Sequence, residues 1–422
     1  MNVKALAVWS LCLALSSVSP LALPVHPGET VPLDEPRPLA AMDGTFRMRL
    51  LEGGSIECLW VAEKGLTRQR QATATSRPGP AELLSPRSDF PGKHFSDLGL
   101  RTSSEGDSIV VALFRDEFSI DQGHPFYRRF SKEGKPLCGW VGLIPPADVG
   151  AVALLPEIFS GDGGQFQLGF AAMVPPEILG KKLSPGSFWW VTGRIADDQF
   201  AVATNEALRG DTLYAISTGS PIGPSAREAM SLWRTGQGLA WAKLPSLATS
   251  AASPALKVQE SRVDAWHLEG DQVVVAVRVH TSTQYEYQLW VGRGGVGKKL
   301  QKVFIPRQRF YPGSRCTFAK SPSGALYLLG TTQKKKDGPI WQIVAWKVPT
   351  SAREAARSEG TILYEIEWAR GPLCAEFTRA NELILAFSER RIGTDAKGTN
   401  HLCLRQRAEA DLEAKPARPA GK

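Results

Sequence analysis

Five arginines recur at one kind of position along the chain, and their side chains could together bind an anion. Each stands at or just before a short segment that we expect to be the first strand of a structural unit, and they are Arg47, Arg194, Arg262, Arg315 and Arg370. A guanidinium group presents its N–H donors in a planar fork that fits a carboxylate or a sulfate. Two acidic residues, Asp264 and Glu376, belong to the same first segments. If the fold brings these segments together, the arginines and the two acids form a ligand site at one mouth of a central channel.

Asp264 and Glu376 could also act as an acid–base pair. A glycoside hydrolase needs two carboxyl groups at a defined separation, which the spacing of residues in a sequence does not give. Basic loop residues, among them Lys334 to Lys336 and Arg390 with Arg391, would add positive charge to the same face. The alternative is that all these groups are ordinary solvated charges paired with nearby acids, which is the usual state of Lys and Arg side chains in loops.

One segment, from Gly292 to Lys298, matches the phosphate-loop patterns G-x-G-x-x-G and G-x-x-x-x-G-K. A phosphate loop needs a following helix and a Ser or Thr after its Lys. Here Lys299 takes that position, and Leu300 to Pro306 has the composition of a strand. We therefore interpret the segment as a hairpin tip. The chain also lacks the motifs H-E-x-x-H and G-x-S-x-G and metal-ligand spacings, so we expect no metal ion and no cofactor.

The composition indicates a globular, strand-rich protein. The 422 residues are 43% hydrophobic and 22% charged, which excludes a disordered or fibrous chain. Gly and Pro are frequent, with 40 and 30 residues, and 12 Trp stand against 5 Met, a balance that favours turns and strands over helices. The formal net charge of +8 favours anionic partners.

A two-strand unit recurs along the chain at intervals of about 50 residues. Each unit is a strand, a short turn rich in Gly, Asp or Ser, and a second strand rich in β-branched or aromatic residues. The second strands of the seven units begin at Ile56, Ile109, Phe166, Leu213, Val273, Leu326 and Leu383. In the third unit the first strand is predicted at Ala151–Leu155, and in the fourth at Phe200–Thr204. Third and fourth strands follow in several units.

Four antiparallel strands in each unit predict an all-β fold, a β-propeller of four-stranded blades. Radial closure explains how so long an all-β chain avoids exposed sheet edges. We predict seven blades, or six if the first unit is incomplete, because the Pro-, Ser- and Arg-rich stretch from Gln69 to Lys93 resembles a long loop. Short helices are expected at Ser225–Glu228 and Ser351–Glu354, which have the capping-box form S-x-x-E.

The chain ends lie outside the predicted propeller, which we place at residues 43–408. Residues 1–19 have the basic start, short apolar run and small residues of a signal peptide, with an uncertain cleavage site. They predict a protein that is secreted or periplasmic, without a membrane span in the mature chain and without nucleic acid as partner. Residues 20–42 are expected to be extended, and residues 409–422 to form a disordered charged tail.

The mature chain keeps an odd number of cysteines at wide and irregular spacing: Cys58, Cys138, Cys316, Cys374 and Cys403. At least one of their thiols must therefore lack a partner within the chain. We expect most of them to be small buried apolar side chains, and their pairing stays open.

The segment Leu232–Pro245 resembles the Asp-box repeat of sialidase-like propellers, whose pattern S-x-D-x-G-x-x-W forms the turn between the third and fourth strands of a blade. Gly238 and Trp241 match the pattern, whereas Arg234 and Gly236 replace its Ser and Asp. The resemblance implies a propeller, usually of six blades. It also implies an arginine triad, an acidic acid–base residue and a Tyr/Glu nucleophile, none of which can be placed on this chain residue by residue.

Together these patterns predict an exported binding or scaffold module for an anionic ligand, either an acidic glycan or an acidic protein surface. The alternative is a sialidase-like glycoside hydrolase, and whether the protein is an enzyme stays undecided, with binding favoured. The two differ in one feature, since an enzyme needs arginines, a carboxylate and a Tyr or Glu converging in one pocket. The oligomeric state stays open.

Overall fold

The computed structural model is a β-propeller, and it describes most of the chain between Phe46 and Glu413. The described ranges, which contain short gaps, are 46–115, 124–143, 157–160, 166–173, 188–208, 212–217, 230–243, 261–292, 300–304, 316–349, 360–367, 372–391 and 399–413.

The strands of the described residues pair into antiparallel sheets in which neighbours in space are neighbours in sequence. Such up-and-down sheets are typical of propeller blades. The first three sheets are β1 (Phe46–Leu50), β2 (Ile56–Ala62), β3 (Gly65–Gln71) and β4 (Glu82–Pro86); β5 (His94–Thr102), β6 (Ser108–Arg115), β7 (His124–Phe130) and β8 (Val141–Gly142); and β9 (Glu157–Ser160), β10 (Phe166–Met173), β11 (Phe188–Ala196) and β12 (Gln199–Leu208). A 3-10 turn, η1 (Arg87–Asp89), follows β4.

The remaining sheets follow in the same way. They are β13 (Thr212–Ser217), β14 (Met230–Thr235) and β15 (Gly238–Lys243); β16 (Ser261–Glu269), β17 (Gln272–His280), β18 (Tyr285–Gly292) and β19 (Gln301–Phe304); β20 (Cys316–Lys320), β21 (Leu326–Gln333), β22 (Ile340–Lys347) and β23 (Thr361–Glu367); and β24 (Cys374–Phe377), β25 (Glu382–Arg391) and β26 (Thr399–Ala408). Helix α2 (Glu409–Glu413) comes directly after β26.

The predicted number of four-stranded blades is wrong. Among the described residues, five sheets have four strands, not seven or six, and the sheets β13–β15 and β24–β26 have three strands each. After β26 the chain turns at once into α2, so no fourth strand follows there within the described part. The residues after β15, from 244 to 260, lie outside the described ranges.

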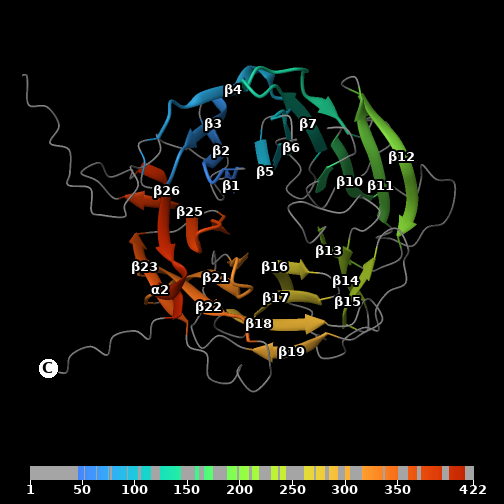
Figure 1. Ribbon diagram of the computed structural model, residues 1–422. Coiled ribbons are helices and arrows are strands. Elements are labelled where there is room, and N and C mark those ends of the chain that lie inside the picture. Colours follow the sequence, from blue (N-terminus) through green and yellow to red (C-terminus); the bar gives the residue numbers. More distant parts are fainter. Residues whose placement is uncertain are drawn as a thin grey trace, which may run out of the picture.

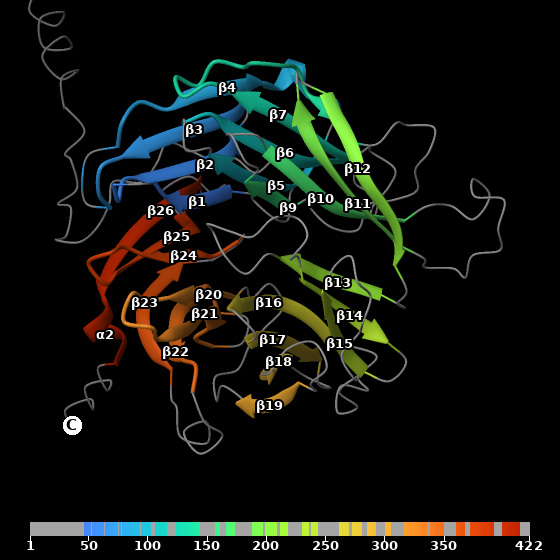
Figure 2. The same ribbon diagram turned by 45° about the vertical axis from the view of Figure 1, so that its right-hand side comes forward.

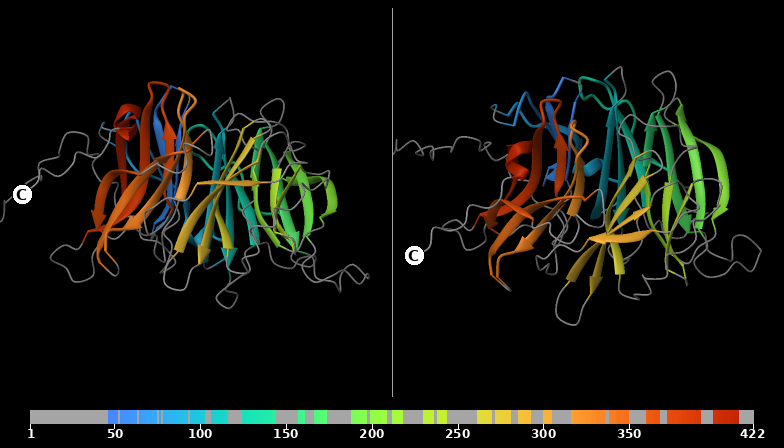
Figure 3. Two further views of the ribbon diagram at one scale, coloured as in Figure 1. Left: turned by 90° about the horizontal axis from the view of Figure 1, so that it is seen from below. Right: turned by 60° about the horizontal axis from the view of Figure 1, so that its bottom comes forward.

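The sheets succeed one another around a ring in sequence order, so the first sheet lies beside the last (Figure 1). Strand β1 contacts both β5 and β24, β20 contacts β16 and β24, and β13 contacts β16. One edge strand of each sheet therefore stands toward the centre, as the turned view also shows (Figure 2). Seen from the side, the strands run between the two faces of the ring (Figure 3).

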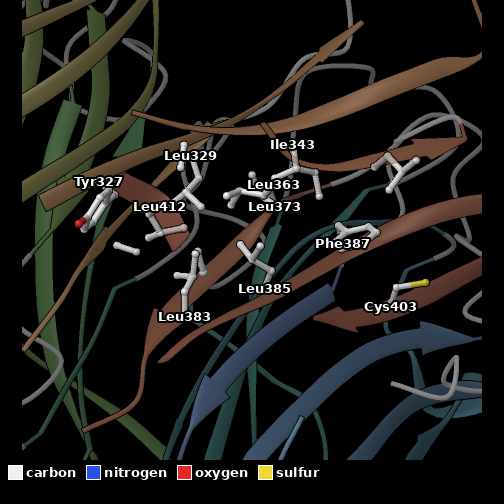
Figure 4. Packing of buried hydrophobic residues seen from close by; sticks show 14 of the residues in the cluster. Tyr327, Leu329, Ile343, Leu363, Leu373, Leu383, Leu385, Phe387, Cys403 and Leu412 are labelled. Atoms are coloured by element: carbon white, nitrogen blue, oxygen red, sulfur yellow. The ribbon is translucent and has the colours of Figure 1, made fainter. Parts of the chain in front are cut away.

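The core is divided among the interfaces between neighbouring sheets, because successive side chains of a strand point to opposite faces. In β2, Cys58 and Trp60 pack toward the last sheet, whereas Leu59 and Val61 pack toward the second. This two-sided burial explains why second strands can carry long apolar runs, such as Val273 to Val277 in β17. Figure 4 shows the interface between β20–β23 and β24–β26, where Leu329 and Ile343 meet Leu383, Leu385 and Phe387, among others.

Five of the predicted first hairpins are confirmed by their register, those that lead into β2, β6, β17, β21 and β25. The fourth is wrong, because Phe200–Thr204 belongs to β12, the far edge strand of its sheet, while Leu213–Ser217 belongs to the next sheet. In the third, β9 at Glu157–Ser160 pairs with β10, and the predicted strand Ala151–Leu155 lies outside the described residues.

The predicted long loop from Gln69 to Lys93 is also wrong, because this stretch contains the end of β3 and the whole of β4. Arg68, Gln69 and Gln71 of β3 are buried, and each donates a side-chain hydrogen bond to a partner in the first sheet or in the loop after β3. Gln69 Nε2 donates to the Gly79 carbonyl at 2.6 Å and Gln71 Nε2 to the Thr73 carbonyl at 2.8 Å, while Arg68 pairs with Glu82. A buried polar group that keeps its hydrogen bonds costs little, so polar composition alone does not exclude a strand.

At the chain ends, the structure covers only part of what was predicted. The predicted disordered tail begins with helix α2, whose residues are thus helical, and residues 414–422 lie outside the described ranges. The predicted signal peptide, the extended segment and the two short helices at 225–228 and 351–354 lie outside them as well. No helix within the described ranges is long and apolar enough to span a bilayer.

Candidate functional site

The predicted arginines are not all brought to one place. Arg47 lies in β1 and Arg262 in β16, both of them edge strands toward the centre. Arg194 lies in β11, paired with Gln167 and Ala201 on either side, so its predicted position on a first strand is wrong. The error follows from the fourth hairpin, since Arg194 precedes an outer strand. Arg315 and Arg370 lie outside the described residues.

Arg47, at the start of β1, is half-buried. Its Nη1 donates to the carbonyl oxygen of Phe46 at 3.2 Å. The guanidinium group is therefore directed back along β1, toward the peptide group of the preceding residue.

Asp264 is built into the sheet β16–β19. The register between β16 and β17 shifts at this residue, a β-bulge that re-aims its side chain. Tyr287 of β18 donates its hydroxyl to Asp264 Oδ2 at 2.5 Å, and Arg278 Nε of β17 lies 3.2 Å from the same oxygen. The side chain of Asp264 is 5% exposed and that of Arg278 is 11% exposed. Burial raises the pKa of Tyr287, and the nearby Cys316 and Asp264 raise it further. Asp264 therefore ties three strands of one sheet together.

Glu376 occupies a different place, the contact between the first and last sheets. The backbone amide of Leu50 in β1 donates to Glu376 Oε2 of β24 at 2.9 Å. Burial raises the pKa of this carboxyl group from 4.5 to about 7, although the Leu50 amide, Arg49 and Arg101 all favour the ionised form. Desolvation therefore dominates over two guanidinium groups and a hydrogen bond.

Arg49, Arg101 and Glu376 stand at equivalent positions on three central strands. Each is the next-to-last residue of its strand before a hairpin turn. The last residue of each strand pairs with the first paired residue after the turn, and these pairs are Leu50–Ile56, Thr102–Ser108 and Phe377–Leu383. Since β1 contacts both β5 and β24, the turns bring the three side chains to one level of the ring. All three residues are partly exposed. We call these three residues the central charge cluster.

A row of charges leads from this cluster outward through the first sheet. Arg49, Glu57 and Arg70 are direct cross-strand neighbours on β1, β2 and β3. Arg49 Nε donates to Glu57 Oε2 at 2.7 Å, and Arg70 Nε donates to Glu57 Oε1 at 2.8 Å. The Glu57 side chain is fully buried, and burial lowers the pKa of Arg49 despite its carboxylate partner.

A second pair extends the row. Arg68 Nη2 lies 2.6 Å from Glu82 Oε2 on β4, and Arg68 Nη1 lies 3.8 Å from Glu57 Oε1. In β5, Arg101 Nε donates to the carbonyl of Ile158 in β9 at 3.3 Å, which links the second and third sheets. Sequence reasoning missed Arg49 and Arg101 because it looked at the starts of the first strands. The available signal was the next-to-last position before each turn.

The loop residues predicted to make one face positive are only partly described. Lys334 is paired, with its Nζ 2.8 Å from Glu365. Arg390 and Arg391 belong to the end of β25, opposite Asn400 and Thr399. Within the described ranges, no group of three or more His, Cys, Asp or Glu side chains is arranged to hold a metal ion.

The segments that resembled known motifs can be placed by their flanking strands. Gly292 ends β18, and the next described strand is β19, which begins at Gln301 and pairs antiparallel with β18, in agreement with the hairpin interpretation. The Asp-box-like segment spans β14 and β15, with its turn between the second and third strands of their sheet. The resemblance predicted a turn between the third and fourth strands, so this turn does not match the family's position.

The comparisons with known proteins give weak structural similarity only. A scan against protein-family models finds no match, and a search of curated proteins also finds none. Similar solved structures include an α-L-arabinanase from Penicillium chrysogenum complexed with arabinobiose, with 9% identity and a TM-score of 0.45 over 91% of this chain and 99% of that chain. Another is a protein of unknown function from Dyadobacter fermentans, with 12% identity and a TM-score of 0.46 over 90% and 98%. A third is an α-L-arabinanase from Cellvibrio cellulosa complexed with arabinohexaose, with 13% identity and a TM-score of 0.33 over 88% and 97%. Values this low assign neither an activity nor a ligand to the chain.

Proposed function

We propose that the protein is an exported binding module that takes an acidic glycan at the central charge cluster. The observation that carries the proposal is the equivalent placement of Arg49 and Arg101 on adjacent central strands, beside Glu376. Two guanidinium groups from neighbouring sheets suit a carboxylate or sulfate group, which accepts hydrogen bonds from both. Their partial exposure supports access for a ligand.

The balance of charge at the cluster also supports an anionic ligand. The cluster and the adjoining row contain four arginines against three glutamates, namely Arg49, Arg68, Arg70 and Arg101 with Glu57, Glu82 and Glu376. Because the pKa of Glu376 is about 7, a large fraction of its carboxyl groups is neutral near that pH. The excess of positive charge therefore grows when Glu376 is protonated, and an incoming anion meets less repulsion.

The test is a binding titration with the full chain. The probes are an oligogalacturonate, which carries uronic acids, and a neutral galactan oligosaccharide of similar length, each measured by calorimetry at low and high salt. We expect the oligogalacturonate alone to bind, with weaker binding at high salt because exposed charges are screened. Arg101→Ala should weaken binding at least tenfold, whereas Lys132→Ala, at an exposed turn of the second sheet, should not. Equal binding of both sugars, or no effect of Arg101→Ala, would reject the proposal.

An acidic protein surface is the other anionic partner to test, with polyglutamate as the probe. Tight binding of polyglutamate together with failure of the oligogalacturonate would replace the glycan by a protein partner at the same cluster. Binding of neither would remove the cluster as an anion site.

A sialidase-like glycoside hydrolase is the second candidate, and one observation favours it. A carboxyl group with a pKa of about 7 can donate a proton near neutral pH, as a general acid must. Turnover of fluorogenic sialosides or uronides that Glu376→Gln abolishes would establish catalysis. Binding of oligogalacturonate without turnover of any of these substrates would establish the binding module.

A further inference from the structure

The cysteines of the described chain lie at different interfaces between sheets, with one exception. Cys138 packs where the second and third sheets meet, Cys316 where β16–β19 meets β20–β23, and Cys403 where β20–β23 meets β24–β26. Cys58 and Cys374 share a single core cluster, the one between the first and last sheets. Of the five thiols, these two are thus the pair that packing brings together.

The strand registers place the two thiols on facing surfaces of this interface. Cys58 in β2 is opposite Met48 in β1, and both belong to the face of the first sheet that packs against the last. Cys374 in β24 is opposite Ala386 in β25, and both contribute to the facing surface. Cys58 is 2% exposed, whereas Cys374 is partly exposed.

The electrostatics of Cys58 agree with this packing. Burial raises the pKa of the Cys58 thiol above its ordinary value, and the largest contribution after burial comes from Cys374. A charge on the Cys374 sulfur therefore changes the pKa of the Cys58 thiol, which requires the two side chains to be near each other.

We propose that Cys58 and Cys374 form a disulfide bond that fastens the first sheet of the propeller to the last. Consecutive sheets are already joined by the chain that runs from one to the next. In the described part of the chain, the first and last sheets meet by side-chain packing and by the hydrogen bond between Leu50 and Glu376. This interface is therefore the one place where a single covalent bond closes the ring. A cross-link between residues so far apart in sequence removes much conformational freedom from the unfolded chain.

The chemistry is a two-electron oxidation by an external disulfide, either a small molecule such as oxidised glutathione or a protein disulfide. One cysteine thiolate attacks the oxidant and displaces a thiolate, which gives a mixed disulfide. The second cysteine thiolate then attacks the mixed disulfide at the cysteine sulfur and displaces the other thiolate. Two S–H bonds are lost, one S–S bond forms, and the oxidant leaves as two thiols. Because burial disfavours the Cys58 thiolate, we place the step before the last sheet closes on the first.

The test follows the bond in the full chain. The protein is unfolded with reductant, refolded with a mixture of oxidised and reduced glutathione, treated with N-ethylmaleimide and digested without reductant for mass spectrometry. We expect a cross-linked peptide pair containing Cys58 and Cys374, and alkyl labels on the other four cysteines of the full chain, Cys12, Cys138, Cys316 and Cys403. Label on both Cys58 and Cys374, or a cross-link of either one to another cysteine, would overturn the proposal.

A stability measurement gives a second readout. The oxidised protein should melt several degrees above the reduced protein, and this difference should vanish in Cys374→Ser, whose side chain is partly exposed. The matched control Cys138→Ser, also at a partly exposed cysteine, should keep the difference. A difference that survives in Cys374→Ser would overturn the proposal. The mass measurement uses the unchanged chain, so it does not depend on how well a variant folds.

Discussion

The backbone amide of Leu50 donates a hydrogen bond of 2.9 Å to Oε2 of Glu376, across 326 positions of sequence. Leu50 ends β1, an edge strand of the first sheet, and Glu376 lies in β24, an edge strand of the last. An edge strand leaves backbone N–H groups that need acceptors, and here a side chain of the neighbouring sheet supplies one. This hydrogen bond therefore joins the first and last sheets near the centre of the ring.

The first prediction concerns the pH dependence of stability. The pKa of Glu376 is raised from 4.5 to about 7 on folding. Between these values the unfolded chain has released the proton while the folded protein keeps it, so the free energy of unfolding falls as the pH rises. The contribution is complete below about pH 4.5 and lost above about pH 7, with a total of up to about 3 kcal/mol.

Glu376→Gln should remove this part of the pH profile, because an amide does not titrate and its oxygen can still accept the Leu50 N–H. Urea unfolding of both proteins across the window measures the difference. Profiles that run parallel would show that the carboxyl group titrates normally in the folded protein.

The second prediction concerns Glu57, whose side chain is fully buried among arginines. Glu57→Gln leaves Arg49 and Arg70 without their carboxylate, and loss of one member of a buried ion pair costs about 3 to 5 kcal/mol. The matched control is Glu365→Gln, since Glu365 pairs with Lys334 at the surface, where both side chains are almost half exposed. An exposed pair contributes about 0 to 1 kcal/mol. Urea unfolding checks both, and equal losses would contradict the burial argument.

The third prediction separates a structural role of Asp264 from a role in ligand binding. Asp264→Asn should cost about 2 to 4 kcal/mol because Arg278 loses its charged partner, and Tyr287→Phe about 1 to 2 kcal/mol because one hydrogen bond is lost. The double variant should cost less than the sum, since both partners act on the same carboxylate. Oligogalacturonate binding by folded Tyr287→Phe should equal that of the wild type. Additive losses, or weakened binding, would contradict a purely structural role.

Local pattern predicted much of the fold. Some elements are specified by a few adjacent residues. One is β17, with its run of valines from Val273 to Val275, and another is the turn at Gly53-Gly54, where both glycines have positive φ. The blade count was wrong because it depends on the outer strands, whose patterns are weaker. Alternating apolar residues look alike in an outer strand and a first strand, and this led to the misplacement of Phe200–Thr204 and of Arg194.

The candidate site was predicted only in part for a related reason. Glu376 was identified, but Arg49 and Arg101 join it only when the hairpins are aligned by their turns. Asp264 was identified as well, yet a bulge directs it into its own sheet. Register and bulges depend on pairing between strands, which a single sequence does not display.

The last prediction concerns Gly134, which sits in the turn that follows β7. Its φ is +85°, a conformation that disfavours residues with a Cβ, and a Cβ here would collide with Nη2 of Arg68, which is buried and paired with Glu82. Gly134→Ala should therefore cost about 1 to 3 kcal/mol, through backbone strain and displacement of Arg68 together. Gly53→Ala isolates the strain, since φ is +98° but nothing lies within 4 Å of the added atom, and should cost about 1 kcal/mol. Gly139→Ala, with open space and no positive φ, should be almost neutral. Urea unfolding of the three variants gives the order, and a cost for Gly134→Ala no greater than that for Gly53→Ala would mean that Arg68 yields freely.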